Sequence, residues 1–165
     1  LMYDSAARVQ EIIDLTPSCV RLTKPFTIKL MGKGNKARIV PLMDEEVAHL
    51  KCYMEKNHLL QPNANLYPLF YNTRKEKLTR SGVQYVLQHY ANMARSEDPK
   101  LIPEKISPHS LRHSKAMHLL QAGVNLVYIR DILGHESVQT TEVYARVDSK
   151  QKRMAIEKAY ADVIK

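Results

Sequence analysis

Apolar side chains recur at helical spacing in several segments of the chain, and residues 2–14 form the first of them. Its apolar residues are Ala6, Val9, Ile12 and Ile13. This spacing predicts an amphipathic helix that ends before Pro17. Further helices are predicted over residues 45–57, 80–95 and 109–122, and between Asn125 and Gly134.

A second pattern follows the first predicted helix, in which apolar and polar residues alternate. Phe26, Ile28 and Leu30 alternate with Thr27, Lys29 and Met31. Alternation of this kind predicts a strand with one buried face. The segment 32–36 is rich in Gly, Lys and Asn and predicts a turn, after which residues 37–42 return as a second strand. Residues 18–22 can supply a third.

Capping residues mark the ends of several predicted helices. Asp44 is placed to cap residues 45–57, and Gly123 to end the helix over residues 109–122. Asn125 caps the next helix, which stops at Gly134. Ser137 can cap a short helix carrying Tyr144, and Asp148 or Ser149 can cap the last one. The expected fold class is mostly α with a small antiparallel β-sheet near the start of the chain.

Composition narrows the class of protein. The 165 residues suit a single domain, and no repeat or linker divides them. No apolar run approaches the roughly 20 residues that span a bilayer, and Asp4 and Arg8 interrupt any signal-like stretch. Lys and Arg exceed Asp and Glu by 25 − 17 = 8, which favours a polyanionic partner. Cys19 and Cys52 have neither metal-site nor disulfide spacing, so a reducing cytosol is the expected compartment.

The segment 109–113, His-Ser-Leu-Arg-His, carries the strongest chemical signal. His109 and Arg112 lie three residues apart at the predicted start of a helix, where backbone N–H groups and the helix dipole favour a phosphate. Leu-Gly-His follows, ending at His135, and Tyr144 lies nine residues later.

These residues resemble the tyrosine recombinases, the phage integrase and Xer-like family, whose C-terminal box reads H-x-x-R, then L-G-H, then a tyrosine. Upstream, residues 7–11 are similar to the family's first arginine box, in outline G-x-R-x-x-E-L, with Arg8 as its arginine. The alanine before Arg8 and the isoleucine after Glu11 depart from it. The turn 32–36 looks like the family's hairpin turn, whose lysine is Lys33. The resemblance runs from about residue 3 to 147 and implies the catalytic-domain fold of that family.

The resemblance also implies a metal-independent, cofactor-free reaction. A tyrosine attacks a DNA phosphodiester, a 3′-phosphotyrosyl intermediate forms, and strands are exchanged. The catalytic residues would be Arg8, Lys33, His109, Arg112, His135 and Tyr144, with Glu11 as a supporting carboxylate.

The chemistry explains why these residue types are needed. Attack builds negative charge on the non-bridging phosphate oxygens, which the guanidinium groups of Arg8 and Arg112 offset. His135 can donate a further hydrogen bond. A tyrosine has a reference pKa of about 10 and needs help to lose its proton, for which His109 is the expected acceptor or orienter. Lys33 resembles the family's general acid for the 5′-hydroxyl leaving group.

Several simpler interpretations compete with these assignments. His109 and His113 have the i, i+4 spacing of zinc ligands, although no third ligand is evident. A basic turn such as the one around Lys33 is more often only solvated, and Arg8 could pair with Glu11 on the surface. Among the other tyrosines, core or half-buried positions are expected for Tyr53, Tyr85, Tyr90, Tyr128 and Tyr160.

The organisation expected from the resemblance is a single catalytic domain over residues 1–165, cut from a longer protein that also has an N-terminal DNA-clamping domain. The expected partners are double-stranded DNA and either identical copies, as a tetramer on DNA, or a related recombinase, in a bacterial cytoplasm at the nucleoid. Alternatives are a type IB topoisomerase and a non-catalytic DNA-binding protein with the same fold. An apolar stripe over residues 156–164 predicts a last helix that packs in cis or against a neighbouring protomer.

Overall fold

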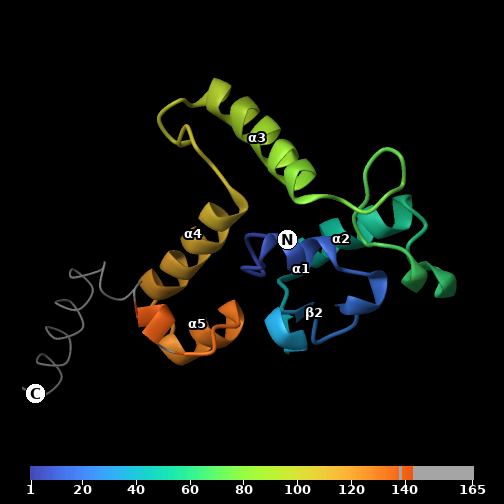
Figure 1. The fold of residues 1–165 in the computed structure, drawn as a ribbon, viewed down its shortest axis with the longest axis horizontal. Coiled ribbons are helices and arrows are strands. Elements are labelled where there is room, and N and C mark those ends of the chain that lie inside the picture. Colours follow the sequence, from blue (N-terminus) through green and yellow to red (C-terminus); the bar gives the residue numbers. More distant parts are fainter. Residues whose placement is uncertain (138, 143–165) are drawn as a thin grey trace, which may run out of the picture. The chain divides into compact units, whose positions relative to one another are not determined.

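The computed structural model describes residues 1–137 and 139–142 (Figure 1). The chain divides into two compact units, residues 1–115 and residues 116–165, and each is described by itself. Within the described residues, helices dominate and the only sheet has three antiparallel strands, as the sequence predicts. No helix in this part of the chain is both long and apolar enough to cross a membrane.

The first unit opens with a tight turn rather than with the predicted helix over residues 2–14. Only α1, Val9–Ile13, is helical, so the prediction is wrong for residues 2–8. Ala6 lies in the left-handed region with φ of 49°, and Arg8 is extended, with φ of −72° and ψ of 151°. Because neither conformation fits a right-handed helix, the chain turns sharply and α1 begins after Arg8.

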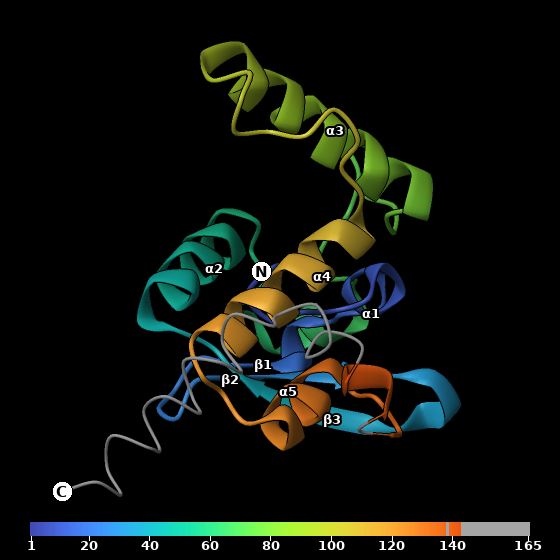
Figure 2. The same ribbon diagram turned by 90° about the vertical axis from the view of Figure 1, so that its left-hand side faces the viewer.

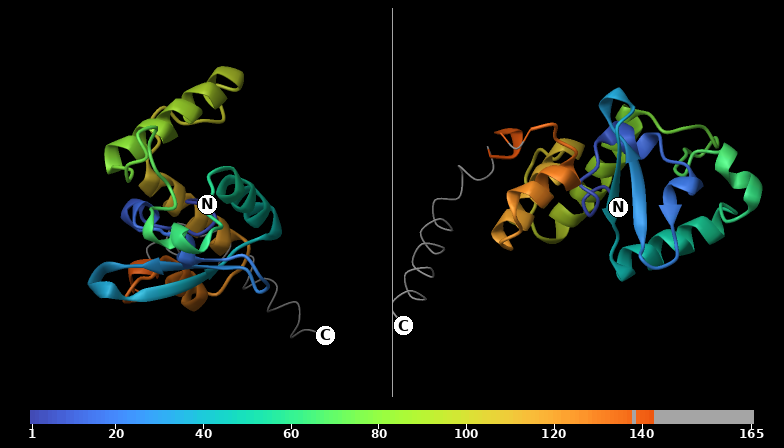
Figure 3. Two further views of the ribbon diagram at one scale, coloured as in Figure 1. Left: turned by 90° about the vertical axis from the view of Figure 1, so that its right-hand side faces the viewer. Right: turned by 90° about the horizontal axis from the view of Figure 1, so that it is seen from below.

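The sheet follows in the order β1 (Val20–Arg21), β2 (Thr27–Met31) and β3 (Ala37–Pro41), with all neighbours antiparallel (Figure 2). Ile28, Leu30 and Val40 are buried on one face. A short 3₁₀ segment, η1 (Pro17–Cys19), precedes β1, and η2 (Lys33–Asn35) forms the hairpin turn between β2 and β3 (Figure 3). The predicted strands and turn are thus confirmed, with shorter ends.

Three more elements complete most of the first unit. They are α2 (Asp44–Lys56), the 3₁₀ segment η3 (Pro62–Leu66) and α3 (Arg80–Glu97). The N-cap of α2 is Met43, one residue before the predicted Asp44. Thr79 caps α3 by accepting a hydrogen bond from the Gly82 N–H at 3.0 Å.

The tyrosines of these helices divide into two groups. Tyr53 on α2 is half-buried, as predicted, and its hydroxyl donates to the Leu69 carbonyl at 3.1 Å. Tyr85 and Tyr90 on α3 are 72% and 64% exposed, which contradicts the prediction of core or half-buried positions. In the first unit α3 contacts α1, but the pattern of α3 does not reveal that these two tyrosines lie off the packed face.

Helix α4 (Pro108–Gln121) begins in the first unit and ends in the second, which also contains α5 (Leu126–Leu133) and a helical stretch over residues 139–142. Gly123 and Gly134 adopt φ of 79° and 62°, and Asn125 accepts a hydrogen bond from the Val127 N–H at 2.8 Å, as predicted. Ser137 likewise accepts from the Gln139 N–H at 3.1 Å.

Within the second unit, Ile129, Leu133 and Thr141 are fully buried. Tyr128 is 65% exposed, which corrects the half-buried placement predicted for it. Tyr144, Tyr160 and the predicted last helix with its apolar stripe lie outside the described residues.

Candidate active site

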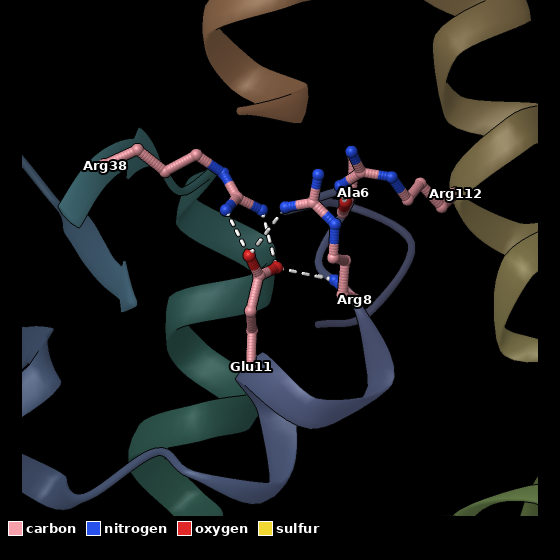
Figure 4. A network of polar contacts seen from close by, with 5 residues as sticks. All are labelled: Ala6, Arg8, Glu11, Arg38 and Arg112. Atoms are coloured by element: carbon pink, nitrogen blue, oxygen red, sulfur yellow. Dashed lines mark hydrogen bonds and ion pairs between the residues drawn. The ribbon is translucent and has the colours of Figure 1, made fainter. Parts of the chain in front are cut away.

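Glu11 is the centre of a polar cluster in the first unit (Figure 4). The Arg8 backbone N–H donates to Glu11 Oε2 at 2.6 Å, which caps α1, and Arg8 Nη1 lies 3.1 Å from Oε1. Arg38 reaches across from β3: its Nη2 donates to Oε2 at 2.7 Å and its Nη1 pairs with Oε1. Glu11 is only 4% exposed. One buried carboxylate therefore bridges two guanidinium groups.

The charge of Glu11 is stabilised by these contacts. Burial alone would raise the pKa of the Glu11 carboxyl, because it disfavours the charged form. The hydrogen bonds from Arg38 and from the Arg8 backbone, together with both positive charges, outweigh burial and leave the pKa below its usual value. Glu11 therefore remains ionised at neutral pH and holds the two arginines together.

Arg112 enters the same region from α4. Its Nη1 donates to the Ala6 carbonyl at 2.5 Å, and the residue is 5% exposed. Ala6 lies two residues before Arg8, so both arginines contact the segment 6–11, and in Figure 4 their guanidinium groups point toward the same region. One helical turn later, Lys115 Nζ lies 3.3 Å from Asp4 Oδ1 and ties the opening turn to α4 a second time.

Lys33 begins the exposed hairpin turn beside this cluster. Gly32, the residue before it, packs so closely that a Cβ there would lie 3.5 Å from Glu11 Oε1 and 3.8 Å from Arg8 Nη1. The Gly32 N–H donates to the Lys36 carbonyl at 2.8 Å, which closes the turn. The backbone at Lys33 is therefore adjacent to Arg8, while its side chain is exposed.

His109 lies at the first turn of α4, where the Ser107 hydroxyl accepts from the Ser110 N–H at 3.2 Å. Unlike Arg112, three residues on, His109 is exposed. It lines a groove of about 690 Å³ in the first unit, shared with residues of α1 and α3. The other lining residues are Val9, Arg80, Ser81, Gln84, Tyr85, Gln88, Ser107 and Pro108. His109 and His113 belong to no cluster of three or more possible metal ligands within the described part of the chain.

His135 belongs to the second unit, just after the left-handed Gly134. The backbone N–H of His135 donates to the Arg130 carbonyl at 3.1 Å, and the ring Nδ1 lies 3.1 Å from the hydroxyl of the fully buried Thr141. These two contacts fix the position and orientation of the imidazole ring. Tyr144 lies outside the described residues.

Arg38 is the residue of this cluster that the sequence analysis missed. A signal was present, because alternation along residues 37–41 places Arg38 on the same face as Val40, and the hairpin register pairs it with the buried Leu30. An arginine at an inward-facing position requires a buried acidic partner. Glu11, already expected to be a supporting carboxylate, is that acidic partner.

The strained Ala6 gives the first prediction. We expect Ala6→Gly to change the free energy of unfolding little, while Ala7→Gly lowers it by about 1–2 kcal/mol. Both alanines are fully buried and both variants lose a methyl group and gain freedom in the unfolded chain. Only Ala6 has a positive φ, and relief of that strain returns about 1–2 kcal/mol. Urea unfolding of both variants measures the difference, and equal costs at the two positions would contradict the argument.

Comparison with known proteins identifies the family to which this chain belongs. The model of the phage integrase family matches residues 1–151. Tyrosine recombinase XerD of Yersinia pestis is 36% identical over 154 residues, and XerC of Thermodesulfovibrio yellowstonii is 37% identical over 154 residues. These alignments cover 93% and 91% of this chain but 50% and 49% of the relatives, so the chain spans about half their length.

Solved structures agree with this relationship. XerA recombinase superposes with a TM-score of 0.77 at 28% identity, covering 96% of this chain and 55% of that one. The catalytic domain of bacteriophage HP1 integrase superposes with a TM-score of 0.58 at 26% identity, covering 94% and 76%. The fold is therefore that of a tyrosine recombinase catalytic domain. The chain belongs to the phage integrase family.

Proposed function

We propose that this chain is the catalytic domain of a tyrosine site-specific recombinase, in which Tyr144 attacks a DNA phosphodiester and strands are exchanged without a metal or cofactor. The observation that carries the proposal is the joint anchoring of Arg8 and Arg112 on the segment 6–11. A relative of the same fold, XerH at 28% identity and a TM-score of 0.74, has been solved in a post-cleavage complex with its difH substrate.

The cluster suits a phosphate electrostatically. Arg8, Arg38 and Arg112 carry three positive charges against the single negative charge of Glu11, so the site keeps an excess of positive charge. The Arg8 side chain is 40% exposed, in contrast to 10% for Arg38, and can meet a ligand from solvent. Guanidinium groups already held in place stabilise the pentavalent transition state, and each such donor is worth about 10²–10³ in rate.

The proposal assigns a proton transfer to each of the remaining residues. As the bond from the Tyr144 oxygen to phosphorus forms, the phenolic proton passes to His109 or to solvent that His109 orients. As the bond from phosphorus to the 5′ oxygen breaks, Lys33 gives that oxygen a proton. In the proposed tautomer, His135 Nδ1 accepts from the Thr141 hydroxyl 3.1 Å away, and the proton on Nε2 is donated to a non-bridging oxygen. The product is a 3′-phosphotyrosyl enzyme. The 5′-hydroxyl of a second DNA end can attack this bond and release the tyrosine.

The proposed setting is a larger assembly on DNA. Because the relatives are about twice as long as the matched region, the whole protein is proposed to clamp duplex DNA with a further N-terminal domain. It would act as a tetramer of identical copies or together with a related recombinase, in the cytoplasm of a bacterium, at the nucleoid.

A nicked suicide substrate tests the proposal. A labelled duplex from the flanks of the encoding gene, nicked just beyond the scissile phosphate, loses its leaving strand on cleavage and traps the intermediate. We expect a covalent protein–DNA adduct that survives denaturing electrophoresis and forms in excess EDTA. DNA binding without an adduct would instead support a non-catalytic DNA-binding protein. Relaxation of supercoiled DNA lacking any recombination site would support a type IB topoisomerase.

A further inference from the structure

We propose that Arg38 is a positioning residue that locks the β2–β3 hairpin onto Glu11 and thereby places Lys33 at the phosphate held by Arg8. The inference rests on the function proposed above, because it assigns Lys33 the role of proton donor. Arg38 would act without touching DNA, through the carboxylate that it shares with Arg8.

The contact between Arg38 and Glu11 joins two elements that are far apart in sequence. Both terminal nitrogens of Arg38 meet the two carboxylate oxygens of Glu11, so the pair has two-point geometry. Such geometry fixes both distance and orientation, which a lysine at this position could not do. Arg38 is five residues after Lys33 on the same hairpin. The Arg38–Glu11 ion pair therefore fixes the base of the turn against α1.

Gly32 forms the second attachment of the hairpin. A Cβ at Gly32 would lie in ordinary van der Waals contact with Glu11 Oε1 and Arg8 Nη1, so the turn packs directly against the Arg8–Glu11 pair, and it would crowd the Lys36 carbonyl oxygen at 3.3 Å. Beyond Gly32 the chain is exposed, and Gly34 and Asn35 both adopt positive φ. The base of the turn is therefore held on the cluster, while Lys33 begins the segment that extends from it.

Charge provides a further reason for Arg38. A buried carboxylate requires a closely paired cation, and Arg38 is far less exposed than Arg8. Because Arg38 and Arg8 share the single charge of Glu11, the cluster keeps a net positive charge on the side where Arg8 is exposed. The same contact thus serves both cationic groups that the reaction requires.

The test compares two suicide substrates, one with the natural 5′ oxygen at the scissile bond and one with sulfur in its place. A thiol has a pKa of about 8.5 and departs without a donated proton, so loss of a general acid affects only the oxygen substrate. We expect Arg38→Gln to lower single-turnover cleavage of the oxygen substrate about 10²-fold, the scale of a misplaced catalytic group. On the sulfur substrate we expect a loss several-fold or smaller.

Matched variants define the outcomes. Lys33→Ala should show the same selective loss, and Arg8→Ala should lose activity on both substrates. Lys29→Gln removes an exposed positive charge from the same hairpin and should behave as wild type on both. Equal losses for Arg38→Gln on the two substrates, or failure of sulfur to rescue Lys33→Ala, would overturn the proposal.

Amide hydrogen exchange gives a readout that needs no activity. Arg38→Gln should accelerate exchange at the Gly32 amide, while Lys29→Gln should not, and α2 should remain protected in both variants. If wild-type protein forms no adduct with either substrate, the proposed function fails. Unchanged exchange at Gly32 in a folded Arg38→Gln variant would separately refute the anchoring role of Arg38.

Discussion

Tyr144→Phe should reduce the covalent protein–DNA adduct to below detection while DNA binding stays within a few-fold of wild type. Phenylalanine retains the ring but lacks the oxygen to which the proposed mechanism bonds phosphorus, so under that mechanism no general acid, base or guanidinium group can compensate. Suicide-substrate cleavage followed by denaturing electrophoresis measures the adduct, and a mobility shift on the same duplex measures binding.

Tyr128→Phe provides the matched control for this experiment. Tyr128 is on α5 in the second unit and is 65% exposed, so loss of its hydroxyl should leave adduct formation unchanged. Adduct formation at a wild-type rate by Tyr144→Phe would remove the nucleophile assignment. Loss of the adduct in both variants would show that the assay responds to any tyrosine change and not to the nucleophile.

Local signals predicted the elements whose conformation is decided within a few residues. Gly123, Asn125 and Gly134 end or begin helices where predicted, because positive φ and side-chain capping depend on the residue itself and its immediate neighbours. The hairpin was predicted for the same reason, from alternation on either side of a turn.

The errors lie where tertiary contacts decide the outcome. Residues 2–8 have an apolar spacing close to that of a helix, yet Ala6 turns into the left-handed region and its carbonyl accepts from Arg112, a residue 106 positions away. Tyr85 and Tyr90 on α3 were misplaced because amphipathic spacing does not say which flank of a helix finds a packing partner.

The residues of the candidate site also divide into those predicted from local sequence and those found only through tertiary contacts. Arg8, Glu11 and Arg112 were identified through motif spacing, which identifies residues with little knowledge of their contacts. Arg38 belongs to no motif that was recognised, and its importance follows only from its pairing with Glu11 across 27 residues. Motif spacing therefore pointed to Arg8, Glu11 and Arg112, whereas a residue that pairs with one of them from another element is identified only in the fold.

Glu11→Gln should lower the free energy of unfolding at pH 7 by about 3 kcal/mol, the cost of leaving a buried cation without its counter-charge. Glutamine matches the shape of glutamate, but its NH₂ group would face the donors of Arg38 or of Arg8. Cleavage should fall as well, because both arginines lose their shared anchor. Urea unfolding and single-turnover cleavage measure the two effects.

The stability difference between wild type and Glu11→Gln should depend on pH in one direction. The folded pKa of Glu11 lies below its usual value of 4.5, so the ionised carboxylate stabilises the fold fully above that value. This contribution is lost as the pH falls through the folded pKa. The stability difference between the two proteins should therefore begin to shrink as the pH falls below 4.5 and should vanish only below the folded pKa of Glu11.

Asp14→Asn is the matched control for this comparison, since the Asp14 carboxyl also pairs with a cation, Lys77, at 2.5 Å. Burial by itself would raise the pKa of Asp14, but hydrogen bonds from Lys77 and Gln10 leave it below the usual value. The Asp14 side chain is 41% exposed, so solvent screens the pair and its loss should cost at most about 1 kcal/mol. A cost for Glu11→Gln no larger than that of Asp14→Asn would mean that Glu11 does not anchor the arginine cluster. A difference that persists unchanged to low pH would show that the shape of the side chain, and not its charge, stabilises this region.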